Sequence, residues 1–179
     1  EMDEDLKNRI IAEARFLRWL HYFNLVRCFG EVPLRTEPVK TGDDSGLPIS
    51  DITEIYQLII DDLIFAAENC WGRLESKNGY QNNIGRATNT AAHALLGKVY
   101  LRIASCKRTS EGGVQGNDKY SNFKNSSESY YQLAKDHCDA AISGEGFLLS
   151  NSLEEWSTIF DPDKGNNPEM IFEVQGSSI

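Results

Sequence analysis

The sequence has 179 residues, of which 40% are hydrophobic and 25% are charged, and its formal net charge is −9. This composition suits a packed core of one domain, or of one and a half, and excludes a disordered chain as the default. An acidic surface without a basic stripe repels a phosphate backbone, so we expect no nucleic-acid partner.

The start of the chain carries no targeting signal. Residues 1–5 are mostly acidic, whereas a secretory signal peptide begins with positive charge. No apolar run reaches the ~18 residues that a membrane-spanning helix needs. Because the first residue is not methionine, we expect the chain to be a portion of a longer protein.

The first predicted helix covers residues 6–29. Gly30 follows it and supplies a left-handed C-terminal position, and Pro33 blocks continuation. Apolar residues recur at spacings of three and four, as an amphipathic helix requires. These positions are Leu6, Ile10, Ala14, Leu17, Leu20 and Leu25.

The second predicted helix covers residues 52–69. Asp51 is a suitable N-cap, and Glu54 three residues later completes a capping-box pattern. Its apolar stripe consists of Ile55, Leu58, Ile59, Leu63 and Ala66.

Two further helices are predicted at residues 89–105 and 128–143. Thr88 and Ser127 are their expected N-caps, and Gly144 ends the last one. The 89–105 helix is rich in Ala and Leu, so we expect it to be deeply buried.

The remaining segments are less regular. Residues 107–126 are polar and rich in Gly, Ser and Asn, which predicts an exposed, mobile loop. Beyond it we expect a short strand or turn at 147–149, a short helix near 153–160 and a strand at 170–175.

Two of the predicted helices resemble each other. Residues 56–58 and 131–133 both read Tyr-Gln-Leu, and the same offset pairs Asp61 with Asp136. We interpret this as two copies of one packing unit, similar to the halves of tetratricopeptide repeats. Small residues at Gly97, Ala134 and Ala141 would let antiparallel helices approach closely.

The expected fold class is therefore mostly α. The chain should form a single domain of tetratricopeptide-like stacked helical hairpins, with long loops and a minor β element near the C-terminus. The expected parts are hairpin one at 5–70, hairpin two at 88–144 and a loop-and-strand segment at 145–179.

No catalytic group stands out. Glycoside hydrolysis needs two carboxylates that face one cleft. The acidic pairs at 43–44, 61–62 and 154–155 are each adjacent in sequence, so on a helix their side chains diverge by ~100°. We interpret them as solvated surface charge and expect no catalytic residue.

We also expect no metal site and no cofactor. His21, His93 and His137 lie on different predicted helices without a ligand partner one turn away, and His93 should be buried against a backbone carbonyl. Residues 161–169 are rich in oxygen ligands but lack EF-hand spacing, so a polar turn is the better interpretation.

The four cysteines leave their redox state open. Without a Cys-x-x-Cys pair, a zinc ribbon or thioredoxin-type site is not expected. Half-buried thiols at helix ends and one or two disulfides both remain possible for Cys28, Cys70, Cys106 and Cys138.

Sugar binding without catalysis needs flat aromatic faces with amide partners nearby. Trp71 and Tyr80 flank a polar loop that contains Asn82, and these three residues are the candidate glycan contacts. The alternative is that Trp71 only closes the end of its helix. Trp156 has the spacing of a core residue, and Trp19 could pack in a helix seam or meet a partner.

A family resemblance covers nearly the whole chain. Residues 12–18, Ala-Glu-Ala-Arg-Phe-Leu-Arg, and the following block at 21–34 closely resemble a motif of the SusD/RagB family. Further blocks at 56–67, 85–101 and 167–175 follow in the order that the family has.

This resemblance implies a non-enzymatic lipoprotein on the outer face of a Bacteroidetes-type outer membrane. Such proteins bind oligosaccharides or other nutrients and deliver them to a SusC-like TonB-dependent transporter. Their only membrane attachment is an N-terminal lipid, which this chain lacks. Family members are typically far longer, so we expect this portion to hold the scaffold and the transporter-facing surface without a complete ligand site.

Two alternatives compete with that function. A cytosolic tetratricopeptide-like scaffold would grip peptides in a concave groove and should show more repeats at a steady ~34-residue period. An enzyme, which has the least support, would need a polar pocket with perturbed carboxylates.

Overall fold

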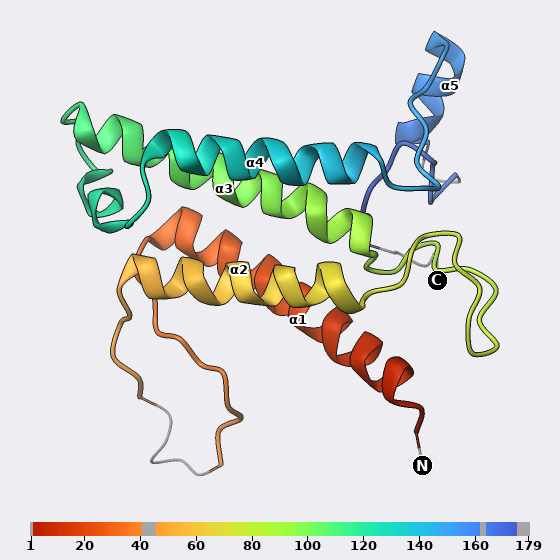
Figure 1. Ribbon diagram of the computed structural model, residues 1–179, viewed down its shortest axis with the longest axis horizontal. Coiled ribbons are helices and arrows are strands. Elements are labelled where there is room, and N and C mark those ends of the chain that lie inside the picture. The colour runs from red at the N-terminus through yellow and green to blue at the C-terminus, as the bar shows by residue number, and fades with distance from the viewer. Residues whose placement is uncertain (1, 41–45, 162–163, 175–179) are drawn as a thin grey trace.

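The computed structural model describes residues 2–40, 46–161 and 164–174. Four long helices dominate this part of the chain and confirm a mostly α fold (Figure 1). In chain order the elements are α1 (Glu4–Phe29), α2 (Ile52–Asn69), α3 (Asn89–Glu111), the 3-10 helix η2 (Asp118–Asn122), α4 (Ser127–Ile142), α5 (Leu153–Ser157) and η3 (Thr158–Phe160).

The long helices form two packed pairs. α1 packs on α2, α3 packs on α4, and α2 joins the pairs by packing on α3 as well. Figure 1 shows α3 and α4 running side by side, with α1 crossing α2. α2 therefore has a helix on two sides, whereas α4 packs chiefly on α3. None of the described helices has both the length and the apolar character needed to cross a bilayer.

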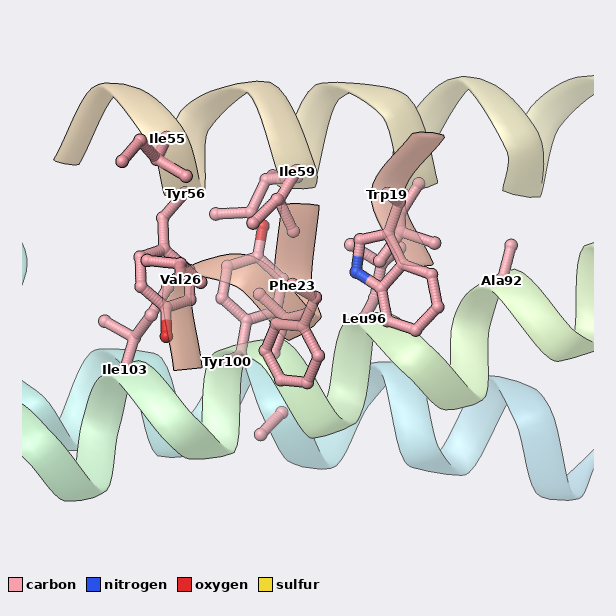
Figure 2. Packing of buried hydrophobic residues seen from close by; sticks show 14 of the residues in the cluster. Trp19, Phe23, Val26, Ile55, Tyr56, Ile59, Ala92, Leu96, Tyr100 and Ile103 are labelled. Atoms are coloured by element: carbon pink, nitrogen blue, oxygen red, sulfur yellow. The ribbon is translucent and has the colours of Figure 1, made fainter. Parts of the chain in front are cut away.

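α1 presents an aromatic stripe to the core, and the aliphatic stripe expected from sequence is wrong. Ile10, Leu17 and Leu25 are exposed. Both stripes have helical spacing, but the aromatic rings bury more apolar area per residue, so they occupy the interior. Figure 2 shows Trp19 and Phe23 between α2 and α3. The buried apolar residues of α1 are Ala12, Phe16, Trp19, Phe23 and Val26.

The predicted helix starts of α2 and α3 are confirmed by their caps. The backbone N–H of Thr53 donates to Asp51 Oδ1 at 2.8 Å, and that of Ala91 donates to Thr88 Oγ1 at 3.1 Å. Each bond satisfies an amide that has no partner within its helix. α4 begins one residue earlier than expected, because Ser126 and not Ser127 is its N-cap.

Gly97 marks a close approach of α3 and α4, as the sequence predicts. A Cβ atom built there would lie 2.5 Å from Cys138 Sγ and 3.2 Å from the carbonyl oxygen of Ala134. Contacts this short leave no room for a side chain, so the glycine sets the spacing between the two helices.

The 107–126 segment is not the exposed loop that its composition suggests. α3 continues to Glu111, and η2 inserts Tyr120 into the core, where its hydroxyl lies 3.0 Å from that of Tyr56. The buried Lys107 ammonium donates to the carbonyl oxygens of Ser121 at 3.2 Å and Phe123 at 2.8 Å. Most polar residues of the segment face water, while Lys107 and the rings of Tyr120 and Phe123 are buried and anchor it.

The correspondence between α2 and α4 holds on the surface and fails in the interior. Gln57 donates to Asp61 at 2.8 Å, and Gln132 donates to Asp136 at 2.7 Å, as the offset predicts. Tyr56 is fully buried, however, whereas Tyr131 is only partly buried. The helices differ because α2 lies between two neighbours and α4 does not, so the tetratricopeptide-like repeat is not established.

Asp62 corrects the interpretation of the 61–62 pair as solvated charge. Its side chain is 1% exposed and binds Arg18 of α1 in a bidentate ion pair. The Arg18 Nε donates to Oδ2 at 2.7 Å, and Nη2 donates to Oδ1 at 2.6 Å. This ion pair fastens α1 to α2 and raises the pKa of the Arg18 guanidinium.

The described part of the C-terminal segment has no strand, so the expected strand at 170–175 is wrong for residues 170–174; residue 175 lies outside the described part. The buried Arg73 guanidinium holds this segment by donating to the carbonyl oxygens of Asn166 at 2.8 Å and Met170 at 3.0 Å. Side-chain donors replace a backbone ladder here, which explains why an extended chain stays packed without a sheet.

Candidate functional site

The predicted glycan contacts lie in the segment that follows α2. Trp71 comes directly after the α2 C-cap and is buried, with 4% of its surface exposed, whereas Tyr80 is 44% exposed. Their ring centroids are 5.9 Å apart in an edge-to-face arrangement. The fold therefore brings these two rings together, while Asn82 is exposed and accepts a hydrogen bond from the backbone N–H of Ile84 at 3.4 Å.

A tight turn positions Tyr80. Lys77 and Tyr80 form an antiparallel bridge around Asn78 and Gly79, which both have positive φ. An Asn-Gly pair accommodates such a two-residue turn with little strain. The buried Asn83 fixes the base of this segment by donating to the carbonyl oxygens of Gly72 and Glu75 at 2.7 and 3.0 Å.

Arg9 of α1 lies against both rings. Its guanidinium carbon is 4.1 Å from the Trp71 ring centroid and 4.7 Å from that of Tyr80. Arg9 Nε donates to Glu13 at 3.0 Å, and the same carboxylate binds Arg86 at 2.5 and 2.9 Å. Since Trp71 is buried with Arg9 on its face, Tyr80 is the ring of the pair that has area left for a ligand.

The other two tryptophans, Trp19 and Trp156, lie in different environments. Trp19 is buried in the helix seam, stacked on Phe23 at 5.6 Å. Trp156 is 49% exposed and pairs edge-to-face with the exposed Phe160 at 5.3 Å, so the expectation that it packs in the core is wrong. The spacing within α5 was correct for a helix, but that short helix projects from the bundle (Figure 1).

A cavity lies at the opposite end of the helix pairs and was missed by sequence reasoning. It measures about 440 Å³ and is lined in part by Arg27, Phe29, Arg102 and Lys119. Lys119 pairs with Glu31, which follows the α1 C-cap Gly30. The lining of this cavity comes from α1, the start of α2, α3 and the 107–126 segment, which the sequence alone gave no reason to join.

The acidic pairs singled out in the sequence are exposed or engaged in an ion pair in the part of the chain that the structure describes. Asp61 is exposed, Asp62 is paired, and both Glu154 and Glu155 are exposed; the pair at 43–44 lies outside the described residues. Those residues also contain no group of three or more His, Cys, Asp or Glu side chains that could hold a metal ion.

The structure also describes the state of the cysteines and the partner of His93. All four cysteines are free; Cys28 and Cys138 are exposed, and burial raises the pKa of the Cys70 thiol to about 12. His93 does not bind a backbone carbonyl as expected, because its Nδ1 lies 3.0 Å from Nδ1 of His137 on α4. The two histidines are 44 residues apart, so no local pattern linked them.

Known proteins resemble this chain in sequence and fold. A SusD-like family model described as "Starch-binding associating with outer membrane" matches residues 1–101. A SusD-like protein of Bacteroides ovatus is 28% identical over 174 residues, which cover 97% of this chain and 27% of that protein.

Two solved structures are also similar. One, a crystal structure with xylogluco-oligosaccharide, is 27% identical with a TM-score of 0.74, over 97% of this chain and 30% of that one. A laminarin-binding SusD-like protein is 28% identical with a TM-score of 0.67, over 96% of this chain and 31% of that one. This chain thus spans less than a third of the length of these relatives.

Proposed function

This chain belongs to the SusD-like family, and from that membership we propose that it is part of a protein that binds oligosaccharides at the bacterial outer membrane. In this proposal the protein captures a glycan outside the cell and delivers it to a SusC-like TonB-dependent transporter without cleaving it. The localisation and the delivery rest on the family resemblance.

The observation that carries the proposal is the similarity to proteins described with a bound glycan. The whole fold of this chain, and not one motif, matches the structure solved with xylogluco-oligosaccharide at a TM-score of 0.74. The laminarin-binding protein matches over nearly the same span. Because both ligands are glucan-based, a neutral glucan oligosaccharide is the first ligand class to test.

The proposed glycan contact in this chain is the open surface of Tyr80, with Trp71 and Arg9 behind it. A pyranose ring stacks on an aromatic face through its C–H groups, and amide side chains bind its hydroxyls. Tyr80 is the more exposed ring, and Asn82 is an exposed amide two residues away. Trp71 acts here through Tyr80, because its own surface is buried.

Calorimetry on the full-length protein tests this proposal with xylogluco- and laminari-oligosaccharides. Tyr80→Ala should remove one stacking contact worth about 1 kcal/mol, which corresponds to roughly fivefold weaker binding. Phe29→Ala, which removes an exposed ring at the other end of the bundle, is the matched control and should leave the affinity unchanged. Equal affinities for wild type and Tyr80→Ala would remove Tyr80 from the site, and absence of binding to any glycan would refute the function.

The non-enzymatic part of the proposal has a separate readout. After long incubation with the full-length protein, the oligosaccharide should keep its length when the products are separated by chromatography. Cleavage that disappears when a carboxylate of this chain is changed would overturn this part. Delivery predicts that the full-length protein co-purifies from outer membranes with a TonB-dependent transporter, and failure to do so under mild detergent would contradict it.

A further inference from the structure

Two histidines meet across the seam between α3 and α4, away from the proposed glycan contact. The Nδ1 atoms of His93 and His137 are 3.0 Å apart, and the ring centroids are 5.3 Å apart with an interplanar angle of 29°. The ring of Tyr100 stacks on that of His137, with 5.5 Å between the ring centroids and an interplanar angle of 13°. Both imidazoles are half-buried, so they are held by packing and still reach solvent.

The seam fixes these rings more firmly than a loop would. His93 lies one turn before Gly97, where α3 and α4 approach closely, and His137 precedes Cys138, the residue that Gly97 faces. Ligands on packed helices keep their positions without an added ordering cost when a metal binds. Burial lowers the pKa of both histidines, and the neighbouring His93 lowers that of His137 further, which favours the neutral form that metals bind.

The separation of the two nitrogens selects a class of metal. For metal–nitrogen bonds of about 2.0–2.1 Å, a 3.0 Å separation corresponds to an angle of about 94° at the metal. That angle matches the 90° edge of square-planar or octahedral geometry, whereas tetrahedral zinc needs a separation of about 3.35 Å. Ni²⁺ and Cu²⁺ prefer imidazole ligands in such tetragonal arrangements.

We propose that His93 and His137 form a two-imidazole site for a divalent transition metal of the nickel or copper class. Small adjustments of the two rings direct both Nδ1 lone pairs to one ion while the nitrogens stay near their present separation of 3.0 Å, and water completes the coordination. When the ion binds, the imidazole that carried its proton on Nδ1 takes the tautomer with the proton on Nε2, and the ion cross-links α3 to α4. This site is independent of glycan binding, since neither histidine touches Trp71, Tyr80 or Arg9 among the contacts described.

Calorimetric titration of the full chain with Ni²⁺ at pH 7.5 tests the site. The exposed thiols are removed first with Cys28→Ser and Cys138→Ser, so that sulfur ligands do not contribute. One Ni²⁺ should bind per chain, and His93→Gln or His137→Gln should weaken binding at least about tenfold. His21→Gln, which changes an exposed histidine on α1, is the control and should bind as the parent does.

A second measurement needs no change at either histidine. Paramagnetic Ni²⁺ should broaden the ring proton resonances of His93 and His137 in the parent chain and spare those of His21. Ni²⁺ should also raise the thermal midpoint of the parent, because it binds only the folded seam. Equal affinity in the parent and the His137→Gln variant, or broadening of all three histidines alike, would overturn the proposal.

Discussion

Asp62 lies in the interior with its charge fully paired, and its partner does not share its burial. The Asp62 side chain is 1% exposed and the Arg18 side chain is 31% exposed. Removing one member of a buried ion pair is costly mainly because the other is left without compensation in a poorly solvating environment. The two members of this pair should therefore differ when each is removed.

We expect Arg18→Ala to lower the free energy of unfolding by about 3 kcal/mol, because it leaves a buried carboxylate unpaired. Asp62→Ala should cost less, about 1–2 kcal/mol, since Arg18 can turn towards water. Urea unfolding followed by circular dichroism measures both. Lys7→Ala, which breaks the exposed ion pair with Glu4, is the control and should change the value by less than about 0.5 kcal/mol. Similar losses for Arg18→Ala and Lys7→Ala would contradict the account.

At the level of elements, close packing between α3 and α4 depends on a missing side chain. Gly97 faces the thiol of Cys138 and the α4 backbone at Ala134, and the backbone cannot move aside. The same seam holds the His93–His137 contact, so the spacing of the two helices controls both features.

Gly97→Leu should destabilise the protein by about 1–3 kcal/mol through overpacking at this seam. Lys98→Leu places the same leucine side chain at the next position, which faces solvent, and should have little effect on stability. Thermal unfolding of the two variants gives the comparison. A Gly97→Leu variant as stable as the Lys98→Leu variant would show that the helices are not held at this distance.

At the scale of the whole molecule, the segment after α4 is attached to the bundle by Arg73 and by Phe172, whose ring centroid lies 4.9 Å from that of Phe16 in α1, and a polar contact joins two parts of the segment itself. Arg73 holds the carbonyl groups near residue 170, and Glu169 accepts from the Ser150 backbone N–H at 2.9 Å and from its hydroxyl at 2.5 Å. These bonds lower the pKa of the Glu169 carboxyl below its usual value of 4.5. A carboxyl with a lowered pKa stabilises the folded state at higher pH and loses that contribution as the pH falls through its folded value.

The contact between Glu169 and Ser150 within this segment should therefore weaken in acid, below the usual glutamate pKa of 4.5. Hydrogen exchange at the Ser150 amide, corrected for its intrinsic pH dependence, should show lower protection at pH 3 than at pH 6, because the protonated carboxyl is the poorer acceptor. In Glu169→Gln the protection should be low at both pH values. Protection that does not change with pH in the wild type would contradict this role.

The sequence by itself determined the four long helices, most of their caps and the glycine contact, because periodicity, capping and steric size are local properties of neighbouring residues. It also determined the family, through the motif at residues 12–34. By contrast, the sequence could not decide whether the aliphatic or the aromatic stripe of α1 is buried, because that depends on where α2 and α3 pack. Burial of Tyr120, exposure of Trp156, the covering of Trp71 by Arg9 and the pairing of His93 with His137 were likewise decided by tertiary structure. Each depends on residues distant in the chain, and their contacts form only when the helices pack.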